Sequence, residues 1–119
     1  MSNLNKQNID ARTVIEEDKV YVFTPTETDE VLYLRDYMWY ETVIMMCTSY
    51  TGIVQLPSVA EAKGMRYTIR IDDASNAGSV RDADDSVDWE GDFAPDATDD
   101  YIILESTGHK WNIIYNGIS

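Results

Sequence analysis

The chain has 119 residues, of which 22 are acidic and nine are basic, and its formal net charge is −13 at pH 7. A charge of this sign repels the phosphate backbone and anionic membrane surfaces, so nucleic acid and lipid are unfavourable partners. The length is that of one small domain with a modest core, which leaves little room for a catalytic cleft. Composition therefore favours a protein that binds other proteins and disfavours an enzyme or a cofactor-binding protein.

Cys47 is the only cysteine, so the chain cannot form an internal disulfide and nothing indicates an oxidising compartment. Its neighbours are apolar, and we expect a buried, unreactive thiol. No apolar run reaches the length of a membrane span, and the first residues lack the hydrophobic segment of a secretion signal. We expect a protein that is made and used without the secretory route.

The N-terminal third predicts an arm followed by short strands. Residues 1–18 are polar and weakly patterned, which predicts an arm outside a single β-rich domain at 19–119. Strands are predicted at 19–23 and 31–36, where the side chains alternate between two faces. The run 38–47 is almost entirely apolar or aromatic, which favours a strand covered on both faces, although periodicity alone also permits a short buried helix.

The middle of the chain predicts a strand, a tight helical turn and a second strand. The first strand spans 52–56 and ends at a proline. Ser58 and Glu61 form a Ser-x-x-Glu capping box, which predicts a short helical turn at about 58–63. The strand 65–71 follows, with the clearest two-residue alternation in the chain.

Residues 72–100 predict an acidic loop insert. They contain 11 of the 22 acids and one base, Arg81. A loop of this length is uncommon in a compact domain unless it has a function or is disordered. Trp89 and Phe93 are its large aromatic residues, and we expect them to fix the loop to the domain through an irregular strand between them.

The C-terminal residues predict a hairpin with strands at 101–105 and 110–115, in which Trp111, Ile113 and Tyr115 share one face. The sequence shows no internal repeat and no heptad. Six or seven short strands with one helical turn predict a mainly β protein, a small antiparallel β-sandwich or barrel.

Two stretches resemble virion proteins of tailed bacteriophages. Residues 53–71 contain Leu56-Pro57, an Ala-rich segment, a glycine and Tyr67-Thr68-Ile69, which is similar to a strand–turn–strand pattern of head decoration proteins and of fibre or spike segments. Ser106, Gly108 and Trp111 match the outline of a terminal hairpin that often closes such proteins. The resemblance covers residues 51–71 and 101–117. It carries no functional residues, and the acidic insert has no counterpart in it.

The resemblance implies a structural protein of the virion. Its leading form is a capsid decoration, or cement, protein that binds the outer face of a phage head and the major capsid protein, forms a homotrimer and is made in the host cytoplasm. The alternative is a tail fibre, spike or other tail-associated binding module, with carbohydrate as a possible ligand. Excess aromatics favour burial against partners. The expected contact residues are Trp39, Tyr40, Tyr50, Trp89 and Phe93.

Catalytic and metal chemistry find little support in the residue pattern. His109 is the only histidine and falls in the predicted terminal turn, so we expect it to face solvent and not to form a zinc site or a catalytic pair. The closely spaced acids could form a calcium site instead of a solvated loop, because calcium takes oxygen ligands. Counted from the first acid, the spacing fails the EF-hand pattern. The candidate ligands are Asp82, Asp84, Asp85 and Asp88.

Overall fold

The computed structural model describes residues 19–87, 89 and 93–118, so the predicted arm at 1–18 lies outside the described residues. The described part contains eight strands and one short 3-10 helix, which confirms the prediction of a mainly β protein. In chain order the elements are β1 (Val20–Phe23), β2 (Glu30–Tyr33), η1 (Leu34–Tyr37), β3 (Thr42–Met46), β4 (Gly52–Gln55), β5 (Arg66–Asp73), β6 (Gly78–Arg81), β7 (Tyr101–Ser106) and β8 (Trp111–Gly117).

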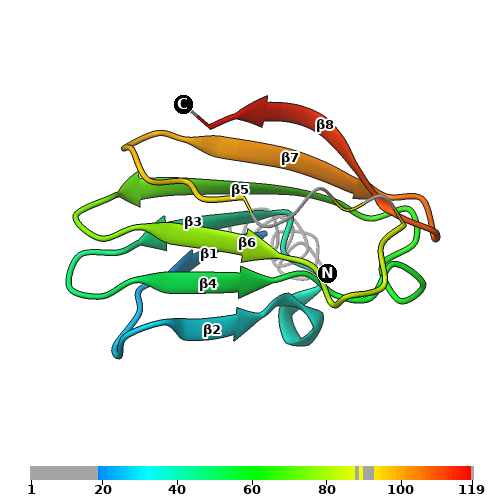
Figure 1. The fold of residues 1–119 in the computed structure, drawn as a ribbon. Helices are drawn as coiled ribbons and strands as arrows, with labels where there is room; N and C mark the ends of the chain where they lie inside the picture. Colours follow the sequence, from blue (N-terminus) through cyan, green and yellow to red (C-terminus); the bar gives the residue numbers. More distant parts are fainter. Residues whose placement is uncertain (1–18, 88, 90–92, 119) are drawn as a thin grey trace, which may run out of the picture.

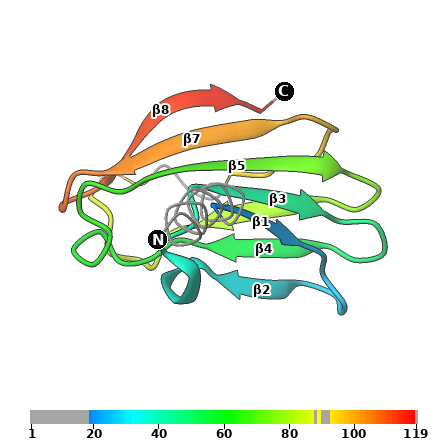
Figure 2. The same ribbon diagram turned by 180° about the vertical axis from the view of Figure 1, so that it is seen from behind.

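The strands form two sheets that lie face to face. One sheet has five strands in the order β1-β3-β5-β7-β8, and the other has three in the order β2-β4-β6. Figure 1 is seen from the side of the three-stranded sheet, and Figure 2 from the side of the five-stranded sheet. A single core of buried side chains from both sheets fills the space between them. The architecture is therefore a sandwich without a closed barrel.

The first six strands alternate between the sheets, so the chain winds as three coils of two strands each. Val20 pairs with Thr42 and Glu30 with Gly52, an offset of 22 residues in both sheets; in the next coil the offset is 26 residues in both. The prediction of an antiparallel sandwich is wrong here, because all four pairings within these coils are parallel. The coils repeat in the structure although the sequence has no internal repeat. Stacked coils require only that the inward side chains be similar in size and apolar character.

Parallel register places similar inward side chains on top of one another. Tyr21, Val43 and Ile69 align across the five-stranded sheet, and Phe23, Met45 and Ile71 form the next inward row. Leu32, Val54 and Val80 form the facing row in the three-stranded sheet. All nine except Tyr21 are buried. This stacking explains why single strands of four or five residues, which are marginal alone, are stable in this fold.

The antiparallel pairing that the sequence predicts is present at the C-terminal end. β5 pairs antiparallel with β7, and β7 with β8. A register shift after Ile103 makes Leu104 the partner of Ile113 and Ile103 the partner of Tyr115. Trp111 and Ile113 therefore share the inward side with Leu104. Tyr115 lies on the outer face with a 51% exposed side chain, so the prediction that it shares their face is wrong.

The acidic stretch 72–100 is more ordered than the sequence predicts. β5 continues to Asp73, and β6 lies wholly inside the stretch. Phe93 exchanges two backbone hydrogen bonds with Val80, of 2.7 and 2.9 Å, and Gly78 N–H donates to Pro95 C=O at 3.0 Å. This segment covers the free edge of β6, where an unpaired strand would otherwise expose its polar backbone.

The single turn predicted at about 58–63 is present, and a helix lies where the sequence patterns predicted part of a strand. Residues 58–63 form one hydrogen-bonded turn and no helix: Ala62 N–H donates to Ser58 C=O at 3.1 Å, and Glu61 N–H donates to Ser58 Oγ at 3.2 Å. The helix is η1, which overlaps the end of the predicted strand 31–36. The strand predicted at 38–47 is confirmed only for β3, because the residues before it connect η1 to the sheet.

Candidate functional site

An aromatic cluster lies at the connection between β2 and β3. It consists of Tyr21, Tyr37, Trp39 and Tyr40, whose ring centroids lie 4.7 to 6.2 Å apart in five contacts. η1 ends at Tyr37, and Tyr40 N–H donates to Tyr37 C=O at 3.0 Å, which folds the connection tightly. The cluster confirms the proximity of Trp39 and Tyr40 and adds two tyrosines that the sequence analysis missed.

The exposure of these rings is uneven. Trp39 is 62% exposed, the largest value among the large apolar side chains described. Tyr21 and Tyr37 are half-buried and pack against the core. Burial and a side-chain hydrogen bond with Tyr37 raise the pKa of Tyr21, so its hydroxyl ionises at a higher pH than that of an exposed tyrosine. The cluster is thus a supported platform with one indole ring facing solvent.

The other three predicted contact residues lie elsewhere. Tyr50 is 39% exposed and follows β3, whereas Trp39 precedes it, so the two residues are at opposite ends of that strand. Trp89 and Phe93 pack edge to face, with centroids 5.2 Å apart, and both rest on the core beside β6. They pack the loop against the domain as predicted, whereas residues 90–92, where an irregular strand was predicted, lie outside the described residues. The five residues do not form one contact surface.

The acidic loop uses its carboxylates to bind its own backbone. The Asp82 side chain is buried and accepts hydrogen bonds from the N–H groups of Asp84 and Ser86, both at 3.1 Å. The Asp85 carboxylate accepts the Val59 N–H at 3.0 Å. Asp88 lies outside the described residues. Within the described ranges no group of three or more His, Cys, Asp or Glu side chains could hold a metal ion.

Removing divalent cations is therefore expected to leave the thermal unfolding midpoint unchanged. The Asp82 and Asp85 carboxylates already serve as hydrogen-bond acceptors, and binding of a cation to the folded state is what would raise the midpoint. Differential scanning calorimetry with and without a calcium chelator measures the effect. Calcium-dependent stabilisation would contradict this expectation.

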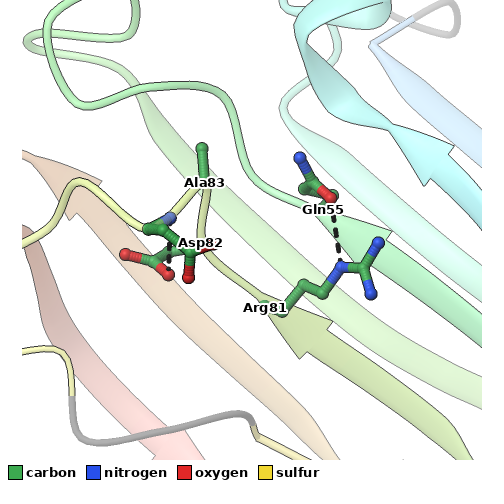
Figure 3. Close-up of a pocket in the computed structure, with 5 residues that line it drawn as sticks. Gln55, Arg81, Asp82 and Ala83 are labelled. Carbon is green, nitrogen blue, oxygen red and sulfur yellow. Dashed lines mark hydrogen bonds between the residues drawn. The ribbon is translucent and has the colours of Figure 1, made fainter.

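A polar hollow of about 390 Å³ lies beside this loop and is lined by Gln55, Arg81, Asp82, Ala83 and Asp84 (Figure 3). The Arg81 guanidinium is turned toward Gln55, whose Oε1 accepts its Nε–H at 3.0 Å, and away from the Asp82 carboxylate. Arg81 and Gln55 are neighbours because β6 stacks on β4 in register. The hollow contains no pair of groups arranged as nucleophile and base.

The outer face of the five-stranded sheet combines apolar side chains with polar ones, which are Thr42, Arg66, Thr68, Arg70, Asp72 and Glu105. Its charged groups are paired: Arg70 Nε lies 2.6 Å from the Asp72 carboxylate, and Arg66 lies 3.7 Å from Glu105. Tyr101 and Tyr115 stack with centroids 5.2 Å apart, and their side-chain hydrogen bond raises the pKa of Tyr101. The apolar members of this face are Val20, Val22, Ile44, Tyr101, Ile103 and Tyr115.

The remaining reactive residues are placed as the sequence predicts. His109 is exposed in the turn between β7 and β8. Cys47 is fully buried, and burial raises the pKa of its thiol, which keeps the thiolate concentration low. No helix in the described ranges is long and apolar enough to span a membrane.

Comparison of the chain with known proteins finds no protein-family model and no curated protein that matches it.

Proposed function

We propose that this chain is a structural protein of a phage virion: a head decoration protein that binds the major capsid protein and copies of itself, as a homotrimer on the capsid surface. In this proposal the protein stabilises the shell by protein–protein contact and performs no catalysis. The strand–turn–strand pattern at 53–71 and the terminal hairpin support the virion assignment by resemblance. The outer face of the five-stranded sheet supports the contact.

The observation that carries the proposal is the charge balance of that face. The chain as a whole carries −13, yet the two bases and two acids of this face pair with one another. A second acidic subunit can therefore approach this face without placing like charges in contact, and repulsion elsewhere is screened beyond about 8 Å at physiological ionic strength. Burial of the apolar side chains of Val22 and Ile44 then contributes a favourable free energy of association.

The size of the face indicates a weak pairwise contact. Five strands about 4.8 Å apart and about five residues of 3.3 Å along each give a footprint of about 400 Å². A standard interface takes about 800 Å² from each partner. Attachment of many copies to a repeating shell compensates for a weak contact, because each bound subunit raises the effective concentration of its neighbours. A decoration protein binds to its shell in many neighbouring copies of this kind.

Replacing Ile44 with Asp is expected to weaken self-association and shell binding at least tenfold while leaving the fold intact, because Ile44 is a half-buried apolar residue of the face. Ile53→Asp is the matched control, since Ile53 is also half-buried but lies on the outer side of the three-stranded sheet. Analytical ultracentrifugation measures the first effect. Co-sedimentation with heads of the parent phage that lack the protein measures the second.

Equal losses in the two variants, or a wild-type chain that stays monomeric at high concentration and ignores the heads, would contradict the proposal. Quantitative mass spectrometry of purified virions separates the two virion locations. Hundreds of copies per particle support head decoration, and a handful would indicate the tail-associated alternative.

A further inference from the structure

The exposed member of the aromatic cluster is Trp39, and its neighbour Tyr40 is half-buried. Trp39 and Tyr40 have centroids 5.2 Å apart and planes inclined by only 33°. Trp39 is 62% exposed, which is unusual for a residue that gains much from burial. Two rings of similar inclination, one of them open to solvent, form a shallow apolar platform.

The platform is held in place from beneath. Tyr37 lies 6.2 Å from the Trp39 ring and 6.1 Å from the Tyr40 ring, and it packs at 4.7 Å on Tyr21. η1 is anchored by Leu34, which is fully buried. The rings are thus fixed before any ligand arrives, which lowers the entropy lost on binding.

Polar groups of both kinds lie next to the platform, because Glu41 directly follows Tyr40 in the chain and Lys19 is bonded to Glu41. The Glu41 carboxylate lies 3.4 Å from Lys19 Nζ, and both side chains are largely exposed. Glu41 N–H donates to Lys19 C=O at 2.7 Å, which fixes the two residues side by side. A hollow of about 330 Å³ lies next to Glu41 and is lined by Glu41, Thr42, Met65, Arg66 and Thr68, so the two rings are not among its lining residues.

The aromatic rings and the neighbouring polar groups together indicate which class of ligand fits. A pyranose ring has an apolar C–H face that stacks on an aromatic ring, and its rim hydroxyls both donate and accept hydrogen bonds. Glu41 offers an acceptor, and Lys19 offers a donor. Nucleobases also stack on aromatic rings, but the net charge of −13 repels their phosphates. The same charge disfavours acidic sugars, so the chemistry fits an uncharged saccharide.

We propose that Trp39 and Tyr40 stack against a sugar ring of an uncharged saccharide whose hydroxyls bond to Glu41 and Lys19. This inference does not depend on the virion assignment. It concerns the end of the sandwich at the β2–β3 connection, and it adds a ligand to a protein otherwise proposed to bind only proteins.

Titration of the full-length chain with glucose, galactose, mannose and N-acetylglucosamine, followed by tryptophan fluorescence, tests the site. Affinity electrophoresis in gels containing dextran, mannan or galactan tests polymers. At least one of these saccharides is expected to bind, and Trp39→Ala is expected to weaken that binding at least tenfold. Glu41→Gln is expected to weaken it at a nearly unchanged unfolding midpoint, because the ion pair that it removes is exposed to solvent and contributes little to stability.

Tyr50→Ala is the control, because Tyr50 is also an exposed aromatic residue but lies at the other end of β3. It is expected to bind saccharide as the wild type does. The proposal is overturned if no member of the panel binds the wild-type chain, or if Trp39→Ala and Tyr50→Ala bind equally well. Loss of shell binding by Ile44→Asp with saccharide binding retained would separate this site from the protein contact.

Discussion

Replacing Tyr67 with Phe is expected to destabilise the protein by about 1 kcal/mol at neutral pH and to stabilise it relative to the wild type near pH 12. The Tyr67 side chain is fully buried in the core and its hydroxyl donates to the Met38 carbonyl at 3.0 Å. Removing a buried hydrogen bond of this kind costs about 0.5 to 1.5 kcal/mol. The Met38 carbonyl belongs to the connection that carries the aromatic platform.

The reversal at high pH follows from the same burial. Burial raises the pKa of Tyr67 from 10.0 to about 12, because a phenolate in the core would lose its hydration. A group whose pKa is raised on folding stabilises the folded state fully below the unfolded pKa. That stabilisation is lost as the pH rises from about 10 to about 12. Two pH units correspond to about 3 kcal/mol. The Phe variant has no proton to lose and keeps its stability.

Urea unfolding of both chains from neutral pH to about pH 12 measures the crossing of the two stability curves. Other tyrosines titrate in the same range, so the difference between the two chains is the informative quantity. Tyr50→Phe removes an exposed hydroxyl and is expected to follow the wild type throughout. Stability curves that stay parallel for Tyr67→Phe and wild type would show that the buried hydroxyl does not resist ionisation in the folded state.

Substitution of two glycines at equivalent positions of the coil is expected to have unequal effects. Gly52 and Gly78 pair with each other at the start of β4 and β6, and both are buried. A Cβ on Gly52 would lie 2.5 Å from Pro25 Cγ and 3.0 Å from Phe23 Cε2. A Cβ on Gly78 would meet the end of the Met45 side chain at 2.9 Å. A proline ring cannot move aside, whereas a methionine end can.

Gly52→Ala is therefore expected to cost about 1 to 3 kcal/mol, the usual effect of overpacking, and Gly78→Ala less than about 1 kcal/mol. Urea midpoints at constant slope measure both changes. Each variant is the control for the other, because the substitution, the sheet and the register position are the same. An equal or larger loss for Gly78→Ala would contradict the tight contact between Pro25 and β4.

The local patterns of the sequence determined several elements correctly. Alternation predicted β5 because one face of that strand is buried and the other carries Arg66, Thr68 and Arg70. The Ser58–Glu61 pair and Gly64 were recognisable because capping and a positive φ, here 83°, depend on residues a few positions apart. Trp39 and Tyr40 could be predicted as contact candidates from residue type. Their neighbour Tyr21 could not be predicted from the sequence, because it lies on β1, far from them in the chain.

What the tertiary structure alone decided is which strands are partners. The alternation of apolar and polar residues predicts which side of a strand is buried, but it is equally compatible with parallel and antiparallel neighbours. The two hairpin strands β7 and β8 are joined by a short turn, so their pairing was predictable from the sequence. The coil pairs strands that are 22 or 26 residues apart in the sequence. Its stability comes from inward rows such as Leu32, Val54 and Val80, which are similar in size but have different neighbours in the sequence. Composition, charge and strand content are properties of the chain itself. The parallel coil, the paired outer face and the aromatic platform exist only because packing brings distant segments into register.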